Sequence, residues 1–142
     1  MQKIKVSGIS SKVLDAYVYW QGNLRHIPKI HRYSMGVRID GLFAEIIELI
    51  SSAIYSPVEK KESFILKAIN RNDVLKFMLL TLLEIKGIEN DKWRVLSLKT
   101  EEMGRILFGW KCQTIEDQNR VSNTVHKNAV NTDSVLNGKD KK

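Results

Sequence analysis

Apolar residues recur every three or four positions along most of this chain, and short polar or proline-containing breaks separate these stretches. The first stretch runs from about residue 11 to residue 27, with apolar positions at Val13, Tyr17, Trp20, Leu24 and Ile27. This spacing places the side chains on one face of a helix. Because Pro28 lacks a backbone N–H, we expect the helix to end at the residue before it.

Two further amphipathic stretches follow, each with recognisable boundary residues. Ser34 is a suitable N-cap for a second helix that extends to about Tyr55. The apolar stripe of this helix comprises Ile39, Leu42, Phe43, Ile46, Leu49, Ile50 and Ala53. The run Ser56-Pro57-Val58-Glu59 has the residue order of a capping box with proline at the first helical position. It predicts a third helix that continues to about Lys86, with Gly87 as its C-terminal cap.

The third and fourth helices differ in how polar they are. The third helix carries a polar centre, Asn70–Asp73, which we expect to bend or loosen it, and the apolar stretch Val74–Ile85 is expected to lie deepest. A fourth helix begins near Asn90. Its inward side chains are predicted to be Trp93, Leu96, Met103, Ile106, Leu107 and Trp110.

These four patterns predict an all-α fold. No strand-like alternation is present, and four amphipathic helices joined by short loops are typical of an antiparallel up-down four-helix bundle. We expect the bundle to cover residues 10–116, after a short N-terminal extension over residues 1–9. Residues 117–142 are polar and Asn-rich without sustained periodicity, and are predicted to form a disordered tail.

Length and composition limit the class of protein. A chain of 142 residues forms one domain, and no apolar run is long enough to span a bilayer. The N-terminus has no signal-peptide pattern, and the single cysteine, Cys112, cannot form an internal disulfide. We therefore expect a cytoplasmic protein with no membrane association.

Catalytic patterns are absent from the sequence. There is no Glu-x-x-His pair, zinc-ligand spacing, P-loop, dinucleotide fingerprint or Gly-x-Ser-x-Gly elbow. Cys112 has no activating partner nearby in sequence, and Glu45 and Glu48 are interpreted as a solvated helix face. We predict a non-enzymatic protein with no catalytic residues, no cofactor and no metal site.

The net charge of +7 is unevenly distributed. No acidic residue occurs between Asp15 and Asp40, and this window contains the candidate nucleic-acid-binding residues Arg25, Lys29, His31, Arg32 and Arg38. They flank the predicted start of the second helix, where free N–H groups and the helix dipole also favour anions. The alternatives are an ordinary solvated connection, or salt bridges to acidic residues elsewhere in an oligomer. Tyr33, in the same window, either stacks on a base or packs on the following turn, and we favour packing.

Two separated motifs resemble a known family. The first is formed by Pro28, Lys29, His31, Arg32, Tyr33, Ser34, Met35, Gly36, Arg38 and Ile39. The second is formed by Gly104, Arg105, Ile106, Leu107, Gly109 and Trp110. Together they resemble the Avd-like (accessory variability determinant) four-helix-bundle family of diversity-generating retroelements. That family also includes four-helix proteins encoded in intervening sequences of ribosomal RNA genes. Phe108 departs from the pattern, which commonly has a small residue there.

The resemblance implies a function that composition alone does not. It implies a basic homo-oligomer, most often a pentamer, that binds RNA or DNA and associates with a reverse transcriptase for mutagenic cDNA synthesis. The alternative is a structural or interaction protein of the ribosomal intervening-sequence type, with weak or no RNA binding. Tyr17, Tyr19 and Trp20 exceed what one inward stripe can bury, and this surplus also favours a homo-oligomer. Gly36 and Gly109 are expected at sites of close helix or subunit approach.

Overall fold

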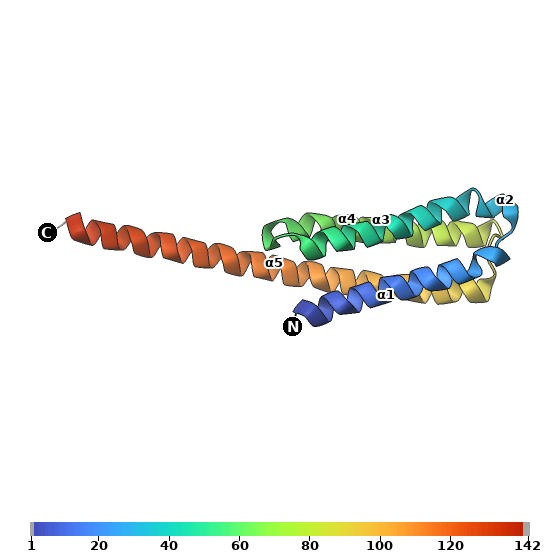
Figure 1. The fold of residues 1–142 in the computed structure, drawn as a ribbon, viewed down its shortest axis with the longest axis horizontal. Coiled ribbons are helices and arrows are strands. Elements are labelled where there is room, and N and C mark those ends of the chain that lie inside the picture. Colours follow the sequence, from blue (N-terminus) through green and yellow to red (C-terminus); the bar gives the residue numbers. More distant parts are fainter. Residues whose placement is uncertain (1, 141–142) are drawn as a thin grey trace.

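The protein is helical throughout the part of the chain that the structure describes. A computed structural model describes residues 2–140, with side chains described for residues 8–129. Residues 2–140 contain no strand, which confirms the all-α prediction. The elements are α1 (Gln2–Asn23), the short 3-10 helix η1 (Leu24–His26), α2 (Lys29–Arg32), α3 (Met35–Tyr55), α4 (Val58–Glu84) and α5 (Asn90–Asp140). Figure 1 shows α1, α3, α4 and the N-terminal part of α5 lying lengthwise beside one another. This packing is compatible with the predicted up-down order.

The first helix begins earlier than the sequence pattern predicts. α1 starts at Gln2 rather than near residue 10, so the expected N-terminal extension is part of the helix from residue 2 onward. Ile9 is completely buried, and the inward stripe runs through Ile9, Val13, Ala16 and Trp20. The stripe predicted from the sequence begins at Val13 and therefore lacks one turn of the core.

The two serines at helix boundaries act on the preceding helix. Ser34 and Ser56 lie where the predicted N-caps were placed, but neither α3 nor α4 has a side-chain cap hydrogen bond at its N-terminus. Ser34 Oγ donates to the carbonyl of Ile30 at 2.9 Å, and Ser56 Oγ donates to Ser52 at 2.6 Å. The boundaries were predicted correctly, whereas the capping-box chemistry was wrong.

In the turn after α4, Gly87 occupies a position that has little room for a side chain. Lys86, not Gly87, adopts the left-handed conformation, with φ of 61°. Gly87 is buried, and a Cβ there would overlap the Leu82 side chain and lie 3.3 Å from Cγ of His31. The glycine is therefore needed because α2 and the end of α4 close upon it.

The apolar half of α4 is only partly buried. Leu75, Leu79 and Leu82 belong to the core, but Phe77 and Leu80 are exposed. The prediction that Val74–Ile85 lies deepest was wrong for this outer face. A continuous apolar run does not reveal which of its faces meets other helices.

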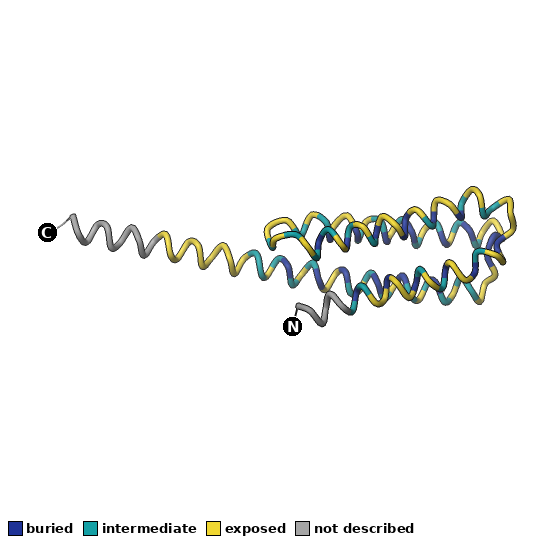
Figure 2. The backbone as a smooth tube through the Cα atoms, in the orientation of Figure 1, coloured by how far each residue is buried: buried dark blue, intermediate teal, exposed yellow. Residues whose placement is uncertain are grey.

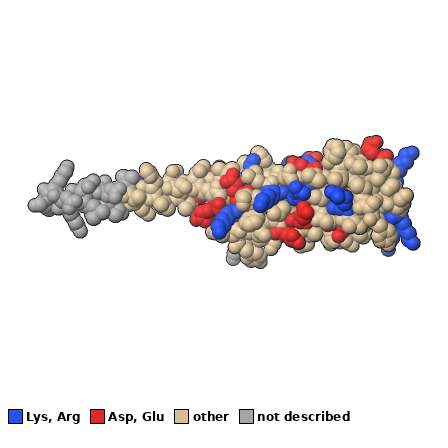
Figure 3. Space-filling view, turned by 90° about the horizontal axis from the view of Figure 1, so that it is seen from above, with Lys and Arg blue, Asp and Glu red and all other residues tan. Residues whose placement is uncertain are grey.

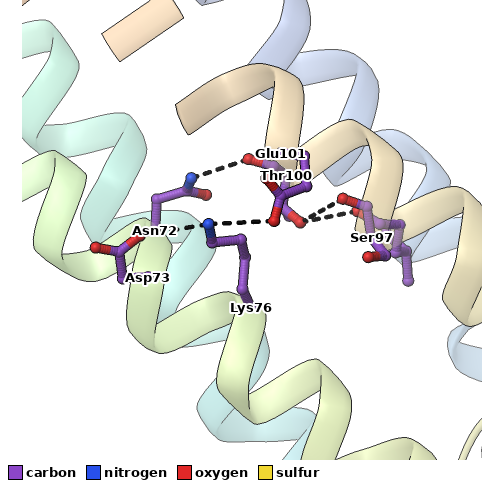
Figure 4. A network of polar contacts seen from close by, with 7 residues as sticks. Asn72, Asp73, Lys76, Ser97, Thr100 and Glu101 are labelled. Carbon is purple, nitrogen blue, oxygen red and sulfur yellow. Dashed lines mark hydrogen bonds and ion pairs between the residues drawn. The ribbon is translucent and has the colours of Figure 1, made fainter. Parts of the chain in front are cut away.

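The polar centre of α4 does not interrupt the helix. Asn72 is only 1% exposed, and its Nδ2 donates to the carbonyl of Thr100 on α5 at 3.0 Å (Figure 4). Thr100 Oγ1 in turn donates to the carbonyl of Leu96 at 3.0 Å. A Cβ at Gly104 would lie 3.3 Å from Asn72 Nδ2, so this glycine makes room for the amide. The polar patch thus joins α4 to α5 within an uninterrupted helix.

α5 continues beyond the other helices. Gln118 Nε2 still contacts another element, because it donates to the carbonyl of Val58 at 2.9 Å. Residues 119–129 are exposed, as Figure 2 shows for the described part of this projection. The structure places residues 117–140 in a helix where the sequence predicted a disordered tail. Because the bundle supplies a formed helix end and no proline follows, the helix can propagate without a new nucleus.

Candidate nucleic-acid interface

The predicted basic residues lie at one end of the bundle, around α2. Arg25 belongs to η1, Lys29 begins α2 and Arg38 lies in the first turns of α3, and all three are exposed. None of them forms an ion pair with any described residue. We call these three side chains the basic end. Figure 3 shows Lys and Arg side chains projecting from the end of the molecule opposite the α5 projection.

Arg32 has a structural role in the same segment. Its Nη2 donates to the carbonyls of Arg25 and Ile27, both at 3.0 Å, and its Nε donates to Ile27 at 3.3 Å. These bonds tie α2 to the turn that precedes it. A guanidinium held in this way is half-buried, so it offers a phosphate fewer free donors than an extended arginine does.

His31 is also packed against the protein. It is half-buried, and its ring carbon Cγ lies close to Gly87 in the α4–α5 connection. The imidazole therefore helps α2 pack onto the bundle. Of the five predicted binding residues, the structure leaves Arg25, Lys29 and Arg38 free to meet a ligand.

α2 packs closely on the first turn of α3. Gly36 is buried, and a Cβ there would lie 3.3 Å from the carbonyl oxygen of His31. A carbonyl oxygen beside this turn contributes negative partial charge, which opposes the positive end of the helix dipole. The exposed cations of the basic end are therefore the groups that favour an anion most directly.

Exposed apolar side chains lie in the same segment of the chain as the cations of the basic end. Tyr33 is 71% exposed, so the prediction that it packs onto the following turn was wrong. Ile30 and Val37, one on either side of it in sequence, are exposed as well. An exposed aromatic ring beside several cations is typical of surfaces that bind single-stranded nucleic acid.

The aromatic residues of α1 have other roles. Trp20 is completely buried, and its ring stacks on Phe43 with centroids 6.3 Å apart. Tyr17 donates its hydroxyl to Asp40 at 3.0 Å. Burial raises the pKa of Tyr17, and the hydrogen bond to Asp40 adds to this effect. The aromatic surplus predicted to mark an interface is therefore absorbed into the core and its edge.

Sequence reasoning missed the contribution of the α4–α5 connection. Lys86 is exposed beside Gly87, and the contact of Gly87 with His31 brings this connection to the basic end. Glu84, Glu89 and Asp91 lie in or next to the same connection. Alternating helix directions could have predicted this proximity, because the first and third connections of an up-down four-helix bundle lie at the same end. The acids moderate the positive charge there.

The remaining family-motif residues are distributed between core and surface. Trp110 is buried in the core, and Pro28 precedes α2, accepting backbone hydrogen bonds from His31 and Arg32 at 2.9 Å. Gly109 has no described atom within 4 Å of a built Cβ, so no close approach within the chain requires it. Of the two alternatives predicted for Gly109, close helix approach within the chain is not observed, and close subunit approach stays a prediction.

Comparisons with known proteins supply no identity. No protein-family model matches the chain, and neither a curated protein nor a solved structure matches it significantly. Within the described residues, no group of three or more His, Cys, Asp and Glu side chains is placed to hold a metal ion. Among those residues, too, no helix has the length and apolar character required to cross a membrane. The class of protein is thus an all-α protein with a basic end.

Proposed function

We propose that this chain is a non-enzymatic nucleic-acid-binding subunit. The observation that carries the proposal is the set of exposed cations Arg25, Lys29 and Arg38, which form no ion pair with a described residue, in the same segment as the exposed ring of Tyr33. No carboxylate occurs in the sequence between Asp15 and Asp40. Cationic side chains contact phosphates without reading sequence, and an aromatic ring stacks on any base. Binding is therefore expected to be electrostatic and weakly sequence-dependent.

The resemblance narrows this proposal. An Avd-like role makes the chain an accessory subunit of a diversity-generating retroelement that joins a reverse transcriptase in mutagenic cDNA synthesis. The same role also implies that the chain folds as an antiparallel up-down bundle, forms a pentameric homo-oligomer and is located in the cytoplasm. The support from this chain is limited to the two sequence motifs, the four long helices and the basic end.

A structural role of the ribosomal intervening-sequence type is the second candidate. Two observations favour it: Arg32 and His31 are engaged within the protein, and Glu84, Glu89 and Asp91 share the end with the cations. On this hypothesis the protein acts through protein contacts, and nucleic-acid affinity is weak at all salt concentrations.

The test is the salt dependence of binding to single-stranded RNA and to duplex DNA. Replacing Arg25, Lys29 and Arg38 with Gln should flatten the log–log salt slope on single strands by about 2 units per protomer, since each phosphate contact contributes roughly 0.7. A matched control replaces Lys60, Arg105 and Lys127, which are exposed elsewhere, with Gln. The control changes the net charge equally and should leave most of the slope intact.

Two outcomes contradict the proposal. Equal effects of the two triple variants would show that only net charge matters. Absence of wild-type binding at low salt would favour the structural role. Tyr33→Leu should weaken single-strand binding more than duplex binding, because only unpaired bases are free to stack.

A further inference from the structure

The short helix α2 separates two groups of charged side chains at one end of the bundle. Lys29 and Tyr33 are one helical turn apart, and the backbone N–H of Tyr33 donates to the carbonyl of Lys29 at 3.3 Å. Their side chains therefore share one face of α2. His31, two residues after Lys29, lies on the opposite face, where its ring approaches Gly87 in the α4–α5 connection. Lys29 and Tyr33 thus point away from that connection, which lies at the same end of the molecule as α2 (Figure 1).

The α4–α5 connection carries a net negative charge. Its three carboxylates are exposed, and none of them forms an ion pair with a described residue. We call these residues, Glu84, Glu89 and Asp91, the acidic rim. Lys86 is the only cation among residues 84–91, and Lys92 and Arg94 come next in α5. The negative charge is therefore confined to the connection itself, on the side of α2 that His31 faces.

A duplex bound at the basic end would bring its second strand close to the acidic rim. An α-helix with its side chains is about 10–12 Å across. The two phosphate backbones of B-DNA face each other across grooves about 6 Å and 12 Å wide. If one strand contacted Lys29 on the outer face of α2, the other strand would lie within about one helix width of it. That distance reaches the acidic rim, where phosphates would be repelled by carboxylates.

A single strand would meet the outer face of α2 without reaching the acidic rim. Its phosphates would contact Lys29 and the neighbouring exposed cations, while an unpaired base stacks on Tyr33, which is 71% exposed. Ile30 and Val37, exposed in the same segment, offer further apolar surface to unpaired bases. In a duplex the faces of the bases are already stacked on one another, so this apolar surface would gain nothing from it.

We propose that the acidic rim makes the basic end selective for single-stranded nucleic acid over duplex. The inference rests on the proposed function, to which it adds the class of ligand and the residues that determine specificity. Discrimination of this kind comes from repulsion of the wrong ligand as well as from attraction of the right one. Charge density alone would give the opposite preference, because a duplex carries one charge per about 1.7 Å and a single strand one per about 3.4 Å.

The experiment measures the affinity of the full chain, at low salt, for a single-stranded DNA of about 12 nucleotides and for the duplex that it forms with its complement. The wild type is expected to bind the single strand more tightly. Glu84→Gln/Glu89→Gln/Asp91→Asn should tighten duplex binding about fivefold, because three repulsions across about 8 Å of water are removed. Binding of the single strand, which lies further from the acidic rim, should tighten by less than about twofold.

The matched control, Glu48→Gln/Glu59→Gln/Glu116→Gln, changes the net charge equally. These three carboxylates are exposed and form no ion pair with a described residue. Glu59 lies in the first turn of α4, as Asp91 lies in the first turn of α5, so both triple variants lose one carboxylate that stabilises a helix N-terminus. The control should leave the ratio of the two affinities at its wild-type value.

Circular dichroism establishes that each variant is folded. If the triple variant of the acidic rim is not, Glu84→Gln/Glu89→Gln is measured instead and should tighten duplex binding about threefold. A wild type that binds the duplex as tightly as the single strand would overturn this inference and leave the proposed function in place. Equal tightening of both probes by the rim variant, or the same change in the control, would overturn it as well. A wild type that binds neither probe would overturn the proposed function and this inference together.

Discussion

The two ends of the bundle both carry surplus positive charge, but they are built differently. At the α2 end, the backbone is held by Arg32, by the close approach of His31 to Gly36 and by the packing of Gly87. At the other end α5 leaves the bundle after Gln118, and residues 119–129 are exposed. Among residues 117–129, Arg120 and Lys127 outnumber Asp117, so positive charge is present there too. The two ends therefore do not differ in the sign of their charge. They differ in the tertiary contacts that fix the backbone carrying the cations, which are present at the α2 end.

The largest expected change in stability comes from altering the packing of the α2 end. Gly87→Ala should destabilise the protein by about 1–3 kcal/mol, because the new methyl group overlaps a buried leucine. Gly109→Ala, at an open helical position, should instead stabilise it by about 0.5–1 kcal/mol. Chemical denaturation of both variants measures these changes. A neutral Gly87→Ala would show that the α2 end is loosely packed.

The second test separates a structural cation from a binding cation. Arg32→Gln should lower the free energy of unfolding by about 1–2 kcal/mol, because backbone carbonyls lose charged donors. Arg38→Gln should change stability by less than about 0.5 kcal/mol, as expected of an exposed charge. Nucleic-acid affinity should instead fall more for Arg38→Gln than for Arg32→Gln. Equal losses of stability would contradict the distinction.

The third test addresses the α5 projection. A chain that ends at Arg120 should keep the stability of the bundle within about 0.5 kcal/mol, because it retains the hydrogen bond from Gln118 to Val58 and residues 121–129 are exposed. Amides of residues 121–140 should show little hydrogen-exchange protection in the full chain, since an unsupported helix is marginal in water. Strong protection there would indicate that the projection is covered, for example by a second copy.

The smallest effect comes from the ion pairs along the sides of the bundle. A hydrogen bond from Lys99, together with its charge, lowers the pKa of Asp15 below 3.8. A lowered folded-state pKa contributes stability above pH about 3.8 that is lost as pH falls through the folded value. The melting-temperature difference between wild type and Asp15→Asn should therefore be small at pH 7 and vanish toward pH 2. Glu116→Gln serves as the control, and a difference that grows on acidification would contradict the assignment.

Part of the candidate site was predictable because it depends on local sequence. The absence of acids from residues 16–39 is a property of the chain itself, and it led directly to Arg25, Lys29 and Arg38. The helix boundaries near Pro28 and Pro57 follow from the chemistry of proline, which acts over one or two residues. The position of Tyr33 at the surface was not predictable, because packing onto the next turn was equally compatible with its neighbours.

The sequence by itself determined that the chain is helical, where the boundaries between the helices lie within a few residues, and where positive charge is concentrated; it did not determine where the first helix begins or where the last one ends. These properties depend on contacts between residues no more than about four positions apart. Only the tertiary structure decided that Arg32 binds carbonyls, that Asn72 is buried against Thr100, that Phe77 is exposed and that Gly87 must be small. Each of these depends on which helix face meets which neighbour. The helical period shows which residues share a face of a helix, but it does not show which neighbouring helix that face contacts. The surface that remains free for a ligand or a second copy is therefore known only once the helices are packed.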